Sequence, residues 1–136
     1  MVRVQNREPA ASVSRFRPIL RRIAPFWVCG LVIGSFLPGS WKRELGTQPY
    51  TPFHAVSFQH RVVHVATFGL TALLFLALAE GRRGQVKAVA GAVLLGLAIE
   101  AGQHAVGLSA VLEWWDLRDD FWAVAGAAVV FGIWRW

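Results

Sequence analysis

The sequence predicts an all-α protein built as a four-transmembrane-helix bundle. Of its 136 residues, 55% are hydrophobic and only 16% are charged, whereas an average soluble domain has about 25% charged residues. The charges gather in the first 22 residues and in short breaks between four apolar segments. We therefore expect a basic cytoplasmic tail over residues 1–22 and a single membrane domain over residues 23–136.

The tail and the first span are predicted from charge and from apolar length. Residues 1–22 hold six arginines and one acid without an apolar period, which is typical of a flexible tail, with a short surface helix at its end as the alternative. The first span is predicted over about residues 23–38, and Pro38-Gly39 ends it. Gly30 and Gly34 form a GxxxG spacing that permits close helix approach, and a homo-oligomer is compatible with it.

The second and third spans are predicted over about residues 61–79 and 86–106, with a basic turn between them. Residues 40–59 form a loop whose conformation the sequence does not decide. The fourth apolar segment, from Phe121 to Trp134, is too short to cross about 30 Å of hydrocarbon. The fourth span is therefore predicted over about residues 115–135. Tryptophans form interfacial belts at both of its ends, and they are Trp114, Trp115, Trp122, Trp134 and Trp136.

Basic residues in the connections predict that both termini are cytoplasmic. Ten of the 14 lysines and arginines flank the side that holds the termini. The other four are Lys42, Arg43, Arg61 and Arg118. The chain is thus expected to be a multi-pass protein of the cytoplasmic membrane. Nucleic acid is not an expected partner despite the net charge of +6, because the basic residues flank apolar segments and form no binding face.

Polar residues at helical spacing interrupt three of the apolar segments. The groups are His60 and His64, then Glu100, Gln103 and His104, then Asp116, Asp119 and Asp120. An ionised side chain in the membrane costs several kcal/mol unless a polar group faces it. The predicted topology places all three groups at one depth near the extracytoplasmic surface. We expect one polar cluster from three helices, with Arg61 as a counter-ion and with Glu100 paired to His64 or Arg61.

Small and hydroxyl residues continue these polar faces toward the cytoplasmic side. Ala88, Ala92 and Gly96 follow the face of Glu100, and Ala123 and Ala127 follow the face of the aspartates. Small side chains predict tight helix packing below the cluster. Thr67 and Thr71 extend the histidine face and are expected to make hydrogen bonds between helices.

Four short motifs resemble those of the VanZ-like family of small bacterial membrane proteins, over about residues 30–134. The motifs are Ser35-x-x-Pro38, then Arg61 with His64 and Phe68, then Glu100-x-x-Gln103, then Asp116 with Asp120. The chain departs from the family pattern at Ala110, where an arginine is frequent. If that arginine pairs with Glu100 or Asp116 in the family, Arg61 or Arg118 replaces it here.

The resemblance implies a four-span protein of the bacterial cell envelope, in the inner membrane, associated through some members with glycopeptide (teicoplanin) resistance. It supplies no established reaction. The expected function is recognition or shielding of a polar envelope group, on a membrane lipid or a cell-wall component. The expected binding residues are Arg61, His64, Glu100, Gln103, Asp116 and Asp120.

Two alternatives use the same residues. One is a membrane enzyme or metal-dependent protein, with His60, His64 and His104 as candidate metal ligands. No HExxH or CxxC pattern and no evident nucleophile supports it, so neither an enzyme nor a metal or cofactor is expected. The other is a structural membrane subunit, in which Asp119 and Asp120 serve only to cap their helix and to interact with its dipole.

Overall fold

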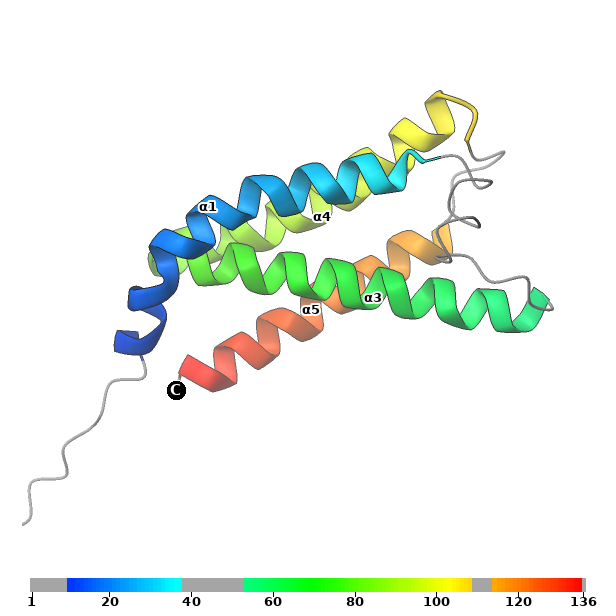
Figure 1. Ribbon diagram of the computed structural model, residues 1–136. Helices are drawn as coiled ribbons and strands as arrows, with labels where there is room; N and C mark the ends of the chain where they lie inside the picture. Colours follow the sequence, from blue (N-terminus) through cyan, green and yellow to red (C-terminus); the bar gives the residue numbers. More distant parts are fainter. Residues whose placement is uncertain (1–9, 38–52, 109–113, 136) are drawn as a thin grey trace, which may run out of the picture.

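The computed structural model describes residues 10–37, 53–108 and 114–135, and these residues form four helices and no strand. The helices are α1 (Ala10–Ser35), α3 (Phe53–Leu78), α4 (Gly81–Ala105) and α5 (Trp114–Arg135). They run alternately in opposite directions, so that the start of α1 and the end of α5 lie at the same end of the bundle (Figure 1). The all-α prediction is confirmed.

Three of the four helices are long and apolar enough to cross a membrane, over Phe16–Ser35, His60–Leu78 and Gly81–Ala105. The fourth helix, α5, differs because acidic and basic residues stand in its first two turns. All four helices nevertheless expose large apolar side chains. Examples are Phe26 at 78% exposure, Leu70 at 54%, Leu94 at 62% and Ile133 at 71%. An apolar surface of this extent is compatible with a membrane-embedded protein.

Three helices begin well before their predicted spans. α1 begins at Ala10, inside the segment expected to be a tail, α3 begins at Phe53, inside the expected loop, and α4 begins at Gly81, inside the expected basic turn. α1 and α3 have 26 residues each, which corresponds to about 39 Å and exceeds the hydrocarbon core of about 30 Å. The spans were predicted from apolar composition alone. The first turns of these helices contain polar residues, so apolar composition did not predict that they are helical. The remainder of the expected loop, residues 38–52, lies outside the described residues.

The start of α1 is tied to the turn between α3 and α4. Arg17 and Arg21 each place a guanidinium nitrogen close to Glu80 Oε1, at 3.1 and 3.2 Å. Arg17 also donates to the carbonyl oxygens of Ala77 and Ala79 at the end of α3. The first turns of α1, which contain Pro18, bend away from the rest of the helix (Figure 1). We call this end of the bundle the basic end.

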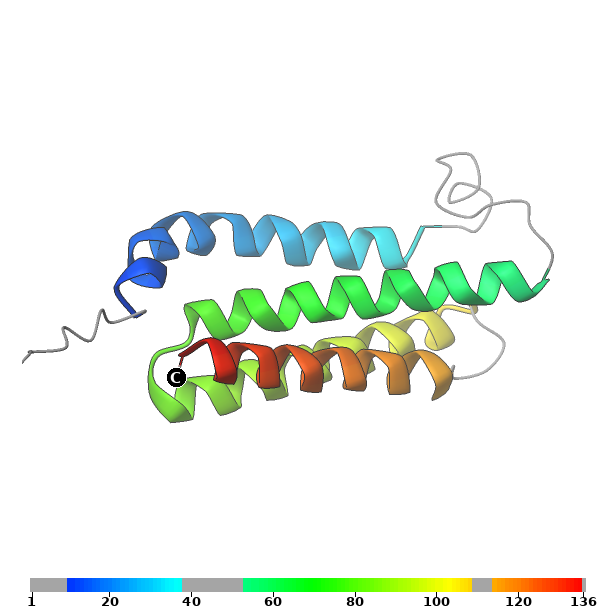
Figure 2. The same ribbon diagram turned by 90° about the horizontal axis from the view of Figure 1, so that it is seen from below.

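The central helix is α3, which packs against each of the other three and most extensively against α5 (Figure 2). Short side chains stand where the helices meet. The predicted small residues are buried, and they are Ala88, Ala92, Gly96, Ala123 and Ala127. Ala72 and Ala92 are fully buried on facing helices, so the backbones approach closely.

Thr71 makes the interhelix hydrogen bond that the sequence predicted. Trp27 Nε1 on α1 donates to Thr71 Oγ1 at 2.9 Å, and Thr71 Oγ1 donates to the Thr67 carbonyl oxygen at 2.7 Å. The buried hydroxyl is therefore satisfied within the apolar interior. Gly30 and Gly34 behave differently, because no described atom lies within 4 Å of the position that a Cβ would take. No other helix of the described chain therefore comes into van der Waals contact with these two positions.

Candidate functional site

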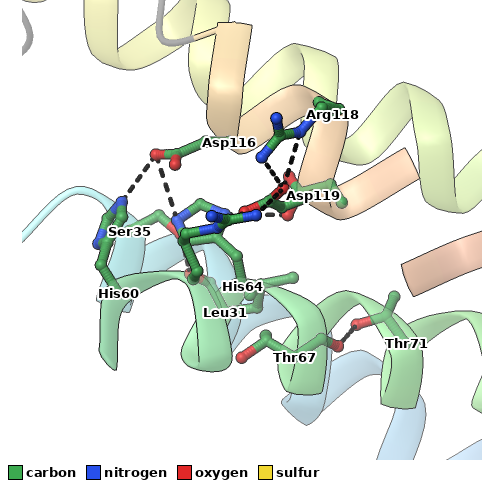
Figure 3. Close-up of polar contacts among 11 residues, drawn as sticks. Leu31, Ser35, His60, His64, Thr67, Thr71, Asp116, Arg118 and Asp119 are labelled. Atoms are coloured by element: carbon green, nitrogen blue, oxygen red, sulfur yellow. Dashed lines mark hydrogen bonds and ion pairs between the residues drawn. The ribbon is translucent and has the colours of Figure 1, made fainter. Parts of the chain in front are cut away.

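Charged and titratable side chains meet between α3 and α5 at the end of the bundle opposite the basic end (Figure 3). We call this group the polar cluster, and its members are His60, Arg61, His64, Asp116, Arg118, Asp119 and Asp120. The first three stand on α3 and the other four on the first two turns of α5. Because the two helices are antiparallel, these positions fall at the same depth, as the sequence predicted.

The two histidines bind two buried aspartates. His60 Nε2 lies 2.8 Å from Asp116 Oδ2, and His64 Nδ1 lies 2.9 Å from Asp120 Oδ1. The second nitrogen of His64, Nε2, lies 3.5 Å from Asp116 Oδ2. Asp116 and Asp120 are 5% and 4% exposed, so each depends on these contacts for the polar environment that burial removes. His64 therefore links the two carboxylates.

Asp119 holds two arginines at the rim of the cluster. Arg61 Nε donates to Asp119 Oδ2 at 2.6 Å, and Arg118 Nη2 donates to Asp119 Oδ1 at 2.7 Å. Asp119 is buried, whereas the arginine side chains are 56% and 38% exposed. The guanidinium of Arg118 also lies 4.6 Å from the centre of the Trp115 ring, a cation–π distance. The positive groups of the cluster thus face outward and the carboxylates inward.

The floor of the cluster is made by an aromatic ring and a glycine. The His64 ring stacks on the buried Phe68 ring at 6.2 Å between centroids. Asp120 Oδ2 lies against Gly96 of α4, only 3.1 Å from the position that a Cβ would take there. This oxygen is buried and has no hydrogen-bond partner among the described residues. Gly96 therefore provides the space in which the Asp120 carboxylate sits.

Glu100 is buried next to the cluster, at 3% exposure, and interacts electrostatically with His64. The sequence had offered His64 or Arg61 as the partner of Glu100. Of these two, His64 interacts with Glu100, whereas the hydrogen bonds of Arg61 go to Asp119. The helix α4 thus contributes one carboxylate, through Glu100, to the inner side of the cluster.

The other two polar residues in the last turns of α4, Gln103 and His104, lie outside the polar cluster. Gln103 Nε2 donates to the Ser35 carbonyl oxygen at 2.7 Å, and so satisfies an acceptor at the end of α1. Gly102 packs so closely on Phe36 that a Cβ would lie 2.7 Å from the Phe36 ring. His104 is exposed in the last turn of α4. Gln103 is therefore a link between helices, and the expected place of His104 among the site residues is not supported by any contact.

Two cluster residues were missed as binding residues. Asp119 was expected in the polar cluster, with helix capping as the alternative, and Arg118 was named for orientation and as a replacement for the family's arginine. In the structure the two form an ion pair at 2.7 Å. The spacing of Asp116, Asp119 and Asp120 already placed all three on one helical face. The sequence does not give the rotation of α5 relative to α3. That rotation determines which aspartate pairs with which histidine or arginine.

One set of donors has the composition of a metal site. His60, His64 and Asp116 each offer one ligand atom, and these atoms lie within 4.8 Å of one another. Two imidazoles and a carboxylate suit a divalent transition metal ion. The third histidine considered from sequence, His104, is not in this set.

Comparisons of the chain with protein-family models, with curated proteins and with solved structures find no match.

The site contains more acidic than basic side chains. With neutral histidines, the cluster and Glu100 carry four carboxylates against two guanidinium groups. The excess of negative charge is buried, and it favours protonated histidines, a protonated carboxyl group or a bound cation.

Proposed function

We propose that this chain is a four-span protein of the bacterial cytoplasmic membrane whose polar cluster binds a phosphate-bearing group of a lipid or lipid-linked envelope component at the extracytoplasmic surface. The observation that carries the proposal is the arrangement of Asp119 with Arg61 and Arg118. A buried carboxylate holds two exposed guanidinium groups side by side at the end of the bundle. Paired guanidinium groups at membrane level are suited to phosphate headgroups.

The two guanidinium groups retain donors for a ligand. Each guanidinium has five N–H donors, and Asp119 accepts from the Nε and Nη2 atoms of both residues. Nη1 of Arg61 and Nη1 of Arg118 make no hydrogen bond to a described residue that would compete with a bound phosphate. Because Asp119 fixes both side chains, a phosphate oxygen would meet donors that are already ordered.

Several features of α5 support its place as the fourth span. Its apolar side chains Val129, Val130 and Ile133 are 59–71% exposed. Exposure of such side chains to water would be unfavourable in free energy. Exposed tryptophans stand near both ends of the helix, as in membrane proteins that place them at the two interfaces. They are Trp114, Trp115, Trp122 and Trp134.

The orientation follows from the two ends of the bundle. The basic end carries Arg17, Arg21, Arg82, Arg83 and Lys87 together with the start of α1 and the end of α5. The polar end carries only Arg61 and Arg118 among the described residues, and both are paired with an acid. The positive-inside rule then supports cytoplasmic termini and an extracytoplasmic polar cluster.

The contacts also support the VanZ-like resemblance as a proposal. His64, from the motif of Arg61, His64 and Phe68, contacts Asp116 and Asp120 of the acidic motif. Gln103, from the Glu100-x-x-Gln103 motif, donates to the carbonyl oxygen of Ser35 in the Ser35-x-x-Pro38 motif. Motif residues that are far apart in sequence thus come together in pairs. Reduced susceptibility to teicoplanin on expression in a susceptible host is the phenotype that this resemblance proposes.

The lipid proposal predicts selective retention of a phosphate lipid. The full chain, purified in mild detergent and incubated with a bacterial phospholipid extract, should retain such a lipid in native mass spectrometry. In the double variant Arg61→Gln with Arg118→Gln, retention should fall by about tenfold or more, because charge-assisted hydrogen bonds to the phosphate are lost. Glutamine still donates to Asp119, so the helix contact is retained in part.

The matched control is Arg82→Gln with Arg83→Gln, which removes the same charge from the basic end and should leave retention unchanged. Equal loss in both double variants, or no retained lipid in the wild-type chain, would contradict the proposal. In that case, loss of folding in the Arg61 and Arg118 variant would favour a structural subunit, in which the ion pairs with Asp119 serve only to hold the helices together. Turnover of the retained lipid would favour the membrane-enzyme alternative.

A further inference from the structure

The polar cluster contains a preassembled set of metal ligands on its inner side. His60 and His64 are one helical turn apart on α3, with ring centroids separated by 4.6 Å. Asp116 of α5 reaches both rings, at 2.8 Å from His60 Nε2 and 3.5 Å from His64 Nε2. In tetrahedral zinc sites, bonds of about 2.0–2.2 Å place ligand atoms about 3.3 Å apart. The two separations from Asp116 fall on either side of that value, and all three ligand atoms lie within 4.8 Å of one another.

A second observation concerns how His64 is held. Its Nδ1 atom lies 2.9 Å from Oδ1 of the buried Asp120, so that the other nitrogen, Nε2, points to Asp116. A carboxylate behind a histidine is the arrangement that fixes the ring and the tautomer of a metal ligand. Phe68 stacks on the same ring and restricts it further. The position of His64 is therefore determined from two sides.

Charge supplies a third reason. The cluster and Glu100 hold four carboxylates against two guanidinium groups, and the arginines lie at the rim while the carboxylates are buried. A divalent cation among His60, His64 and Asp116 would balance the two surplus negative charges with both histidines neutral. Without a cation, the described side chains reach this balance only by binding protons, on the histidines or on the carboxylates.

We propose that His60, His64 and Asp116 bind a divalent transition metal ion of the zinc class, with Asp120 as the residue that positions His64. Three protein ligands leave a fourth coordination position. The His60 side chain is 40% exposed, so the site can be reached from the surface of the protein. The metal site uses the same cluster as the proposed phosphate site, but it does not depend on a lipid being bound.

The test measures zinc on the delipidated full chain, purified without a histidine tag and stripped with EDTA. After addition of Zn²⁺ and gel filtration, elemental analysis should find about one zinc per chain in the wild type. His60→Ala should lower zinc affinity by about 100-fold or more, and Asp120→Asn by about 10- to 100-fold. His60→Cys should retain binding, because a thiolate is also a zinc ligand.

His104→Ala is the matched control, since it removes an exposed histidine from the same end of the protein, and it should bind zinc as the wild type does. Co²⁺ added to the wild-type chain should give the intense visible absorption of tetrahedral coordination. Absence of zinc and of that absorption in the wild type would overturn the metal site and leave ion pairs with protonated histidines in its place. Unchanged zinc content in a folded His60→Ala chain would overturn it as well. Lipid retention is measured separately, so either proposal can fail without the other.

Discussion

Replacing Gly96 by leucine should destabilise the bundle by about 3 kcal/mol and separate His64 from Asp120. A Cβ at this position would lie 3.1 Å from Asp120 Oδ2 and 3.3 Å from the Phe68 ring, and the remaining leucine atoms have no space among α3, α4 and α5. The expected result is a lower midpoint in SDS or thermal unfolding of the chain in micelles. Loss of zinc or lipid binding should accompany it, because the Asp120 carboxylate must move.

Gly126→Leu is the control for this substitution. Gly126 is exposed on α5, and nothing in the described chain lies within 4 Å of its Cβ position. The same substitution without a steric clash should therefore leave stability unchanged or raise it by up to about 1 kcal/mol, because leucine has the higher helix propensity. If Gly96→Leu proved as stable as Gly126→Leu, the close contact of the three helices at Gly96 would be wrong.

His64→Ala is expected to have the second large effect, with a loss of about 3 kcal/mol in the free energy of unfolding. The substitution leaves two carboxylates, Asp116 and Asp120, buried without the imidazole that links them. Breaking a buried charged pair costs more than forming it contributes, because the remaining charge stays desolvated. The measurement is again the unfolding midpoint in micelles, with His104→Ala as an exposed histidine control.

A double-mutant cycle separates the bond from general packing loss. Asp120→Ala in the His64→Ala background removes one of the carboxylates left without the imidazole, so the double variant should be more stable than the sum of the two single changes predicts. Strict additivity of the two effects would show that His64 and Asp120 do not interact in the folded protein.

Much of this site was predictable because membrane helices restrict where polar groups stand. The spacing of His60 and His64 gave the face of α3, and that of Asp116 and Asp120 gave the face of α5. Because consecutive helices run in opposite directions, the histidines and the aspartates were expected at the same depth. The structure brings them within hydrogen-bond distance. The buried small residues Ala92 and Ala127 were predicted by the same periodicity.

The partners were not predictable, because periodicity gives a face of each helix but not the rotation and shift between two helices. Arg61 reaches Asp119 rather than Glu100 as a result of that rotation. Gln103 stands past the point where α4 contacts the cluster, and so it bonds to the end of α1. The starts of α1 and α3 escaped prediction for another reason: helix propensity and tertiary contacts extend a helix beyond the lipid, where apolar composition gives no signal.

The account depends on the polar cluster facing the outside of the cell. Single cysteines at exposed positions, His104→Cys at the polar end and Arg83→Cys at the basic end, can be introduced into a Cys29→Ser chain. On intact cells, a membrane-impermeant maleimide should label position 104 and should reach position 83 only after permeabilisation. Labelling of position 83 on intact cells, with position 104 protected, would place the cluster in the cytoplasm and contradict the account.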